Sequence, residues 1–140
     1  MTQLSARVFT VTGRTDTNGP VALVCLVGEI DIAAAEALSD VADHLSTLAP
    51  HAEVVVDLAE VSFACSTLPN FLDRVHRTLA ADATLTLCRS TPNTRWVLQA
   101  TGIEQIAALR ADLPDSCEAP QPASGKRFLP STRPRNSNRR

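Results

Sequence analysis

Hydrophobic positions along the chain switch between the spacing of strands and the spacing of helices. Alternation over residues 8–12 and an almost continuous apolar run over 21–27 predict two strands, the second covered on both faces. Shorter apolar runs predict three further strands, at residues 54–58, 84–88 and 106–109.

Apolar residues recur at three- and four-residue spacing in the segments between these strands. This spacing predicts helices over 33–48, which Pro50 follows, and from 68 to about 81. A third helix opens at Thr91 and ends at Gly102, its expected C-cap. Because strands and helices alternate after residue 20, we expect an α/β fold. Its sheet should be mixed, with four to five strands and helices packed mainly on one face.

The periodic pattern stops at Pro114. Residues 114–140 contain five of the nine prolines, separated by polar and basic residues. Such a segment buries too little apolar surface to offset the entropy lost on ordering. We therefore expect one folded domain over 1–113 and a disordered, basic, proline-rich tail over 114–140.

Charge divides the chain in the same place. Residues 1–113 hold 7 basic and 13 acidic side chains, whereas the tail holds 6 basic and 2 acidic ones. The basic charges of the tail are sparse, and only Phe128 could stack on a base. We therefore interpret the tail as solubilising, and we expect no direct binding of nucleic acid.

Several classes of protein are disfavoured by what the sequence lacks. No apolar run is long enough to span a bilayer and no signal pattern opens the chain, so we expect a cytoplasmic protein without membrane contact. The widely spaced Cys25, Cys65, Cys88 and Cys117 argue against a disulfide framework or a zinc site. We expect no bound metal and no cofactor. No catalytic constellation occurs in order, so we expect no enzymatic activity.

Two adjacent hydroxyl residues, Ser66 and Thr67, lie between the strand at 54–58 and the helix that follows. A hydroxyl at a helix start can cap the helix, which contributes about 1 kcal/mol. The same place favours a phosphate, because the first turn carries free N–H groups and partial positive charge. Asp57 ends the preceding strand and is interpreted as a carboxylate that braces this loop.

Three motifs in order and spacing point to one family. They are Gly28–Asp31 (Gly-Glu-Ile-Asp), the strand Val54–Leu58 that ends in Asp-Leu, and the third-helix segment Pro92–Ile103. Over roughly residues 7–112 the chain resembles a STAS domain of the anti-sigma factor antagonist type. In that family an Asp-Ser-(Ser/Thr)-Gly-Leu-Gly motif precedes the second helix.

The resemblance implies a partner-switching function. In the family, a kinase that also sequesters a sigma factor phosphorylates the first Ser of the motif. The unphosphorylated protein binds that kinase and frees the sigma factor. By resemblance, Ser66 falls on the phosphorylated position and Thr67 on the second hydroxyl.

The rest of the motif departs from the family pattern. Cys65 replaces an Asp, Leu68 replaces a Gly, and Pro69-Asn70 replaces Leu-Gly. These changes remove an acceptor, add bulk and restrict the backbone, and remove an N–H that could hold a phosphate. The helix itself tolerates Pro in its first turn.

We expect an anti-sigma factor antagonist-like protein that binds an anti-sigma factor with serine kinase activity, controlled by phosphorylation at Ser66 or Thr67. The residues expected to contact the partner are Glu29, Asp31, Cys65, Ser66, Thr67, Leu68 and Asn70. Asp31 is also a candidate cap for the helix after it. Three alternatives stay open: a constitutive STAS scaffold without phosphoregulation, a nucleotide- or lipid-binding module, and a redox sensor at Cys65.

Overall fold

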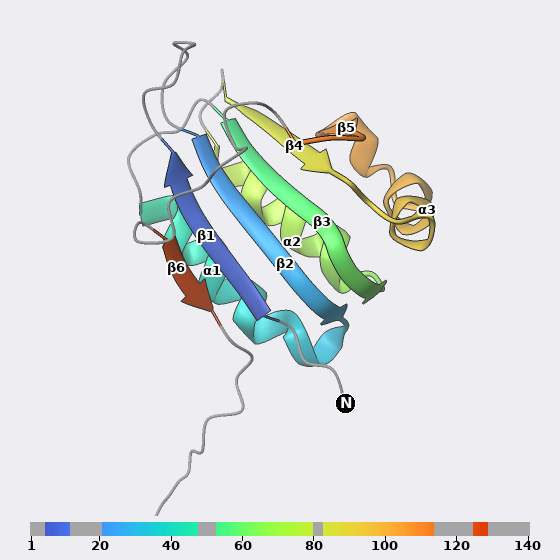
Figure 1. The fold of residues 1–140 in the computed structure, drawn as a ribbon, viewed down its shortest axis with the longest axis horizontal. Coiled ribbons are helices and arrows are strands. Elements are labelled where there is room, and N and C mark those ends of the chain that lie inside the picture. The colour runs from blue at the N-terminus through green and yellow to red at the C-terminus, as the bar shows by residue number, and fades with distance from the viewer. Residues whose placement is uncertain (1–4, 12–20, 48–52, 80–82, 114–124, 129–140) are drawn as a thin grey trace, which may run out of the picture.

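The computed structural model describes residues 5–11, 21–47, 53–79, 83–113 and 125–128. Strands and helices alternate along most of these residues (Figure 1). The elements are β1 (Ser5–Val11), β2 (Val21–Ile30), η1 (Ile32–Ala34), α1 (Ala35–Thr47), β3 (Glu53–Ala64), α2 (Thr67–Thr78), β4 (Thr84–Cys88), α3 (Pro92–Ala100), η2 (Ile103–Gln105), β5 (Ala108–Arg110) and β6 (Gly125–Phe128).

All six strands form one sheet in the order β5-β4-β3-β2-β1-β6 (Figure 1). Strands β2 to β5 are parallel to one another, and β1 pairs antiparallel with both β2 and β6. The predicted α/β class and mixed sheet are therefore confirmed. The sheet has one strand more than the four to five expected, because residues 125–128 pair with β1. Backbone hydrogen bonding there does not need a buried apolar side, so the hydrophobic pattern gave no sign of it. The rest of the tail lies outside the described residues.

Strands β2 and β3 are longer than the hydrophobic runs predicted. The Gly-Glu-Ile segment continues β2, opposite the last residues of β3, with register shifts after Cys25 and Gly28. Gly28 has φ +108°, a conformation that glycine adopts without steric cost. Because β3 runs to Ala64, only Cys65 and Ser66 separate it from α2.

Helices α1 and α2 pack together against one face of the sheet, as predicted (Figure 1). The core between them is almost wholly aliphatic. Its largest fully buried side chains include Leu26, Ile30, Leu38, Leu58, Leu68, Leu72 and Leu87. Helix α3 lies beside β3, toward the β4–β5 side of the sheet (Figure 1). It carries Trp96, which is 69% exposed.

The opposite face of the sheet holds a smaller cluster of Val21, Leu23, Val55 and Cys88. Asp57 lies on this face, in the middle of β3, so its predicted role in bracing the hydroxyl loop is wrong. It accepts hydrogen bonds from Arg89 instead, at 3.1 Å from Nε to Oδ1 and 2.6 Å from Nη2 to Oδ2. No helix among the described residues is long and apolar enough to cross a membrane.

Candidate functional site

The carboxyl ends of β2 and β3 bring two segments of the candidate site together. Ile30 lies opposite Ala64 in the parallel register, and the Cys65 N–H donates to the Ile30 carbonyl at 3.1 Å. The start of η1 and the start of α2 therefore meet at one edge of the sheet. We call this edge the strand-end surface, comprising Glu29, Asp31, Ile32, Phe63, Cys65 and Ser66.

Ser66 is exposed and lies at the N-cap position of α2, yet its side chain makes no capping hydrogen bond. Its backbone is already helical, with φ −62° and ψ −16°, whereas a capping residue has an extended backbone. Of the two roles considered for the hydroxyl pair, capping is therefore not the one that Ser66 has in this structure. Its hydroxyl stays available at the surface.

Thr67 is half-buried, and its Oγ1 accepts a weak hydrogen bond from the Cys65 thiol at 3.6 Å. The two hydroxyls thus differ in access, because Ser66 faces solvent and Thr67 faces its neighbours. Ser66 is therefore the more accessible of the two hydroxyls.

The first turn of α2 offers fewer free donors than most helix starts. The Leu68 N–H donates to the Cys65 carbonyl and the Asn70 N–H to the Ser66 carbonyl, both at 3.1 Å. Pro69 has no N–H to donate. The bond of Asn70 is the first ordinary bond of the helix, so a phosphate at this position would lack two of the usual backbone donors, those of residues 68 and 69.

The strand-end surface also carries two acidic side chains, which come from the end of β2 and the residue after it. Asp31 caps η1, as predicted, because its Oδ1 accepts from the Ala33 N–H at 3.0 Å. Asp31 and Glu29 are both half-buried. A negative charge added at Ser66 would therefore join two carboxylates that are already there.

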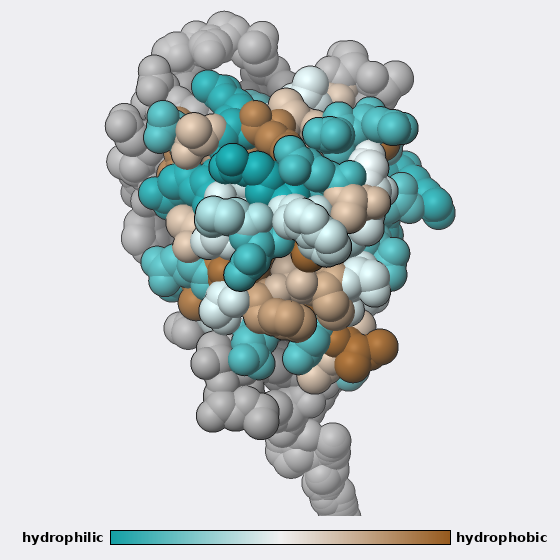
Figure 2. Space-filling view, turned by 90° about the vertical axis from the view of Figure 1, so that its right-hand side faces the viewer, coloured by the Kyte–Doolittle hydropathy of each residue, from teal (hydrophilic) through white to brown (hydrophobic). Residues whose placement is uncertain are grey.

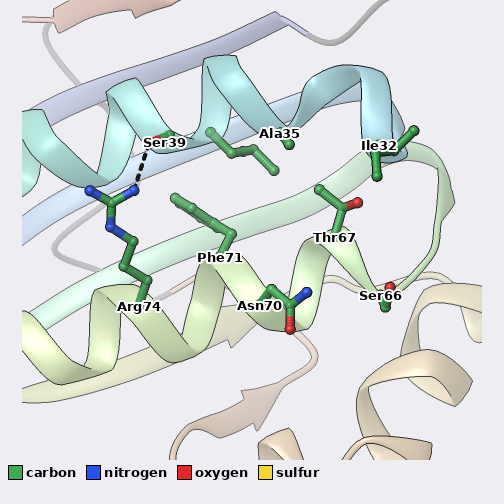
Figure 3. Close-up of a pocket in the computed structure, with 9 residues that line it drawn as sticks. Ile32, Ala35, Ser39, Ser66, Thr67, Asn70, Phe71 and Arg74 are labelled. Carbon is green, nitrogen blue, oxygen red and sulfur yellow. Dashed lines mark hydrogen bonds between the residues drawn. The ribbon is translucent and has the colours of Figure 1, made fainter.

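A groove of about 260 Å³ runs from this edge between α1 and α2. Figure 3 shows Thr67 and Phe71 of α2 directed toward α1, with Ile32 at one end and Arg74 at the other. Arg74 Nη1 donates to Ser39 Oγ at 2.6 Å, and its guanidinium also forms an ion pair with Asp43. Since this cation is held by α1, it stays away from the first turn of α2.

Two large apolar side chains are exposed on the strand-end surface. Ile32 is 83% exposed and Phe63 is 52% exposed. Figure 2 shows hydrophobic side chains gathered in the lower part of one face, toward the end of the molecule where β2 and β3 finish. Exposed apolar residues that gather in one place are typical of protein-binding surfaces.

The predicted contact residues differ in how exposed their side chains are. Glu29, Asp31, Cys65, Ser66, Thr67 and Asn70 have exposed or half-buried side chains at this edge or along the groove. Leu68 is fully buried, so the predicted contact of its side chain with a partner is contradicted. It faces the core because it shares a helix face with Leu72 and Val75.

Sequence reasoning did not single out Phe63 or the bond from Arg74 to Ser39. Phe63 sits in an alternating segment, Val61 to Ala64, whose apolar residues suggested no particular face. Alternation counted from Val61 would place Phe63 on the buried side, whereas in the structure Phe63 is exposed and Ala64 is buried. The bond between α1 and α2 has no signal in the sequence, because it depends on how the helices pack.

The described residues contain no group of three or more His, Cys, Asp or Glu side chains that could hold a metal ion. The candidate site offers instead an exposed hydroxyl, two carboxylates, apolar side chains and an open groove. These features suit the binding of another protein, and a hydroxyl that can be modified.

Comparisons with known proteins agree on one family. The model of the STAS domain matches residues 14–116. An anti-sigma factor antagonist from Mycobacterium paratuberculosis is 24% identical, with a TM-score of 0.61 over 78% of this chain and 90% of that one.

Two further solved structures have similar folds. The anti-sigma factor antagonist SpoIIAA in its unphosphorylated form is 19% identical, with a TM-score of 0.57 over 82% of this chain and 90% of that one. An anti-sigma-factor antagonist (STAS) domain protein from Planctomyces limnophilus is 18% identical, with a TM-score of 0.60 over 76% and 91%. The comparison with curated proteins gives no match.

Proposed function

This chain belongs to the STAS domain family, and we propose that it acts as an anti-sigma factor antagonist-like regulator. In this proposal it is a cytoplasmic binding protein without enzymatic activity. Its partner is an anti-sigma factor with serine kinase activity, which docks on the strand-end surface and on the adjoining groove. The likeness to solved antagonists supports the fold that this proposal needs.

One observation carries the proposal. The bond from Cys65 to Ile30 holds exposed apolar Ile32 and exposed Ser66 on the same edge of the sheet. An apolar anchor that a partner desolvates then stands close to a hydroxyl that a kinase modifies. Large apolar anchors of this kind supply much of the binding energy of protein interfaces.

The charge of the site supports a switch by repulsion. A phosphate on Ser66 adds about −1.5 to −2 charge at pH 7. Glu29 and Asp31 already contribute carboxylates on this edge, and Arg74 is engaged with α1. In the part of the chain that the structure describes, Arg74 would therefore give the phosphate no free cation, and a partner surface matched to a neutral hydroxyl would be released.

The test is capture of tagged protein from its native cells, with mass spectrometry of the bound proteins and of the peptide over residues 62–74. We expect an anti-sigma kinase among the captured proteins and phosphate on Ser66. Ser66→Asp should lower recovery of that kinase at least tenfold, whereas Ser66→Ala should retain it.

Ser62→Asp is the matched control, because Ser62 is exposed four residues earlier and the change adds the same charge. Its recovery of the kinase should fall much less than that of Ser66→Asp. Equal losses in the two variants would mean that general charge, and not the position of Ser66, weakens binding.

A constitutive binder without phosphoregulation is the second candidate. The engaged N–H group of Leu68, together with Pro69, favours it because each removes a backbone donor that could hold a phosphate. It predicts that the kinase is captured with no phosphate on the 62–74 peptide under any growth condition. The same experiment therefore separates the two functions.

A further inference from the structure

Among the residues that the structure describes, β6 is the strand that covers the outer edge of β1. Strand β6 pairs with residues 6–9, whereas β1 spans residues 5–11. Figure 1 shows β6 at the outer side of β1, next to α1. Both strands lie outside residues 14–116, which the STAS domain model matches. The proposed docking surface uses neither of them.

The pairing of β6 with β1 is weak by two criteria. It has four residue pairs, and its register places Arg127 directly opposite Arg7. Like charges at opposed positions weaken an antiparallel pair. Another strand of better complementarity can therefore displace β6.

A second copy of β1 supplies that complementarity. In an antiparallel pair centred on Val8, seven residue pairs form from Ser5 to Val11. Arg7 then lies opposite Phe9 of the other copy, so the opposed arginines disappear. Ala6 and Val8, which are buried in this chain, keep the same side of the extended sheet.

We propose that the β1 edge is a self-association surface, which β6 occupies within one chain and β1 of a second copy occupies in a dimer. Such pairing is isologous and closes with twofold symmetry, so it makes dimers and not open chains of molecules. An unpaired strand edge otherwise offers its free backbone groups to any extended segment. The stability of the β6–β1 pairing then determines the fraction of molecules in which the β1 edge is free to pair with a second copy.

The test compares full-length variants by sedimentation velocity over a range of concentrations. Replacing both Lys126 and Arg127 by Pro removes two N–H donors from β6, so the dimer dissociation constant should fall at least tenfold. Arg127→Glu puts opposite charges at positions 7 and 127, so that constant should rise severalfold. Arg133→Glu, with the same charge change outside the strand, should leave it unchanged.

Hydrogen exchange of the β1 amides gives a second measurement on the same samples. In the double Pro variant, β1 amides should be exposed at low concentration and protected as dimer forms. A monomer with exposed β1 amides at all concentrations would overturn the proposal, since the edge would then be open without self-pairing. A monomer with protected β1 amides would overturn it too, because β6 would then not be what covers the edge.

Discussion

Asp57 is held inside the sheet by one cation. The residue is 8% exposed, and Arg89 donates to its carboxylate through two nitrogen atoms. Arg89 reaches it from a left-handed backbone conformation, with φ +58°, just after β4. The hydrogen bond to Asp57 raises the pKa of Arg89, so the guanidinium stays charged. The Ala59 N–H also donates to Asp57 Oδ1, at 3.2 Å.

Arg89→Met should lower the free energy of unfolding by about 2 kcal/mol, because it leaves the nearly buried Asp57 carboxylate without its cation. Arg77→Met is the matched control, since Arg77 pairs with Asp73 on the exposed side of α2 at 2.8 Å. That change should cost about 0.5 kcal/mol or less. Urea unfolding followed by circular dichroism measures both, and equal costs would contradict the burial argument.

Ile32 is a second residue whose substitution should separate binding from stability. It is 83% exposed, so Ile32→Ser should change the free energy of unfolding by about 0.5 kcal/mol or less. The same change should lower capture of the proposed kinase partner severalfold, because it removes an apolar anchor. A large loss of thermal stability in the variant would instead assign Ile32 a structural role.

The positions of the site residues could be predicted where a sequence motif contains them. The burial of their side chains could not, because it depends on how the elements pack. Asp31 and Ser66 follow from motifs, and both lie at the expected edge of the sheet. The burial of Leu68 and the exposure of Phe63 depend on which face of an element meets the core. Asp57 was predicted at the end of its strand because the apolar run stops at Leu58, whereas β3 continues to Ala64.

At the scale of the elements, α2 and α3 begin in different ways. Thr91 caps α3, because it has an extended backbone and its Oγ1 accepts from the Thr94 N–H at 3.4 Å. Ser66 makes no such bond at the start of α2. Helix α2 is therefore stabilised mainly by packing of its buried face, which includes Leu68, Phe71 and Leu72.

The two helix starts give a direct comparison. Thr91→Ala should lower the free energy of unfolding by about 1 kcal/mol, since a cap is lost. Ser66→Ala should change it by about 0.3 kcal/mol or less, because no capping bond exists to lose. Thermal denaturation of the two variants checks this, and an equal loss would show that Ser66 caps α2 in solution.

Element types were predicted well, and element lengths less so. The strand at 84–88 has its predicted bounds, and Gly102 ends α3 with the φ of +78° that a helix terminus of this kind uses. β3 extends six residues past the predicted Leu58, because β2 gives it a pairing partner through the shifted register. Backbone pairing of this kind leaves little trace in hydrophobic periodicity.

At the scale of the whole molecule, protection should decrease from the centre of the sheet outward. Strands β2 and β3 have strand neighbours on both sides and supply many of the buried side chains. Their amides should exchange only through global unfolding, whereas β5 and β6 at the edges exchange by local opening. Hydrogen exchange with mass spectrometry measures this, and fast exchange in β2 would contradict the architecture.

The exposure of Trp96 determines what the intrinsic fluorescence of this protein can report. It is the only tryptophan, and the chain has no tyrosine. Because its indole is 69% exposed on α3, its emission should differ little between the folded and the unfolded chain. Anything that covers α3 should shift that emission to the blue and protect it from iodide. Fluorescence will therefore follow encounters at this helix, and unfolding needs another signal.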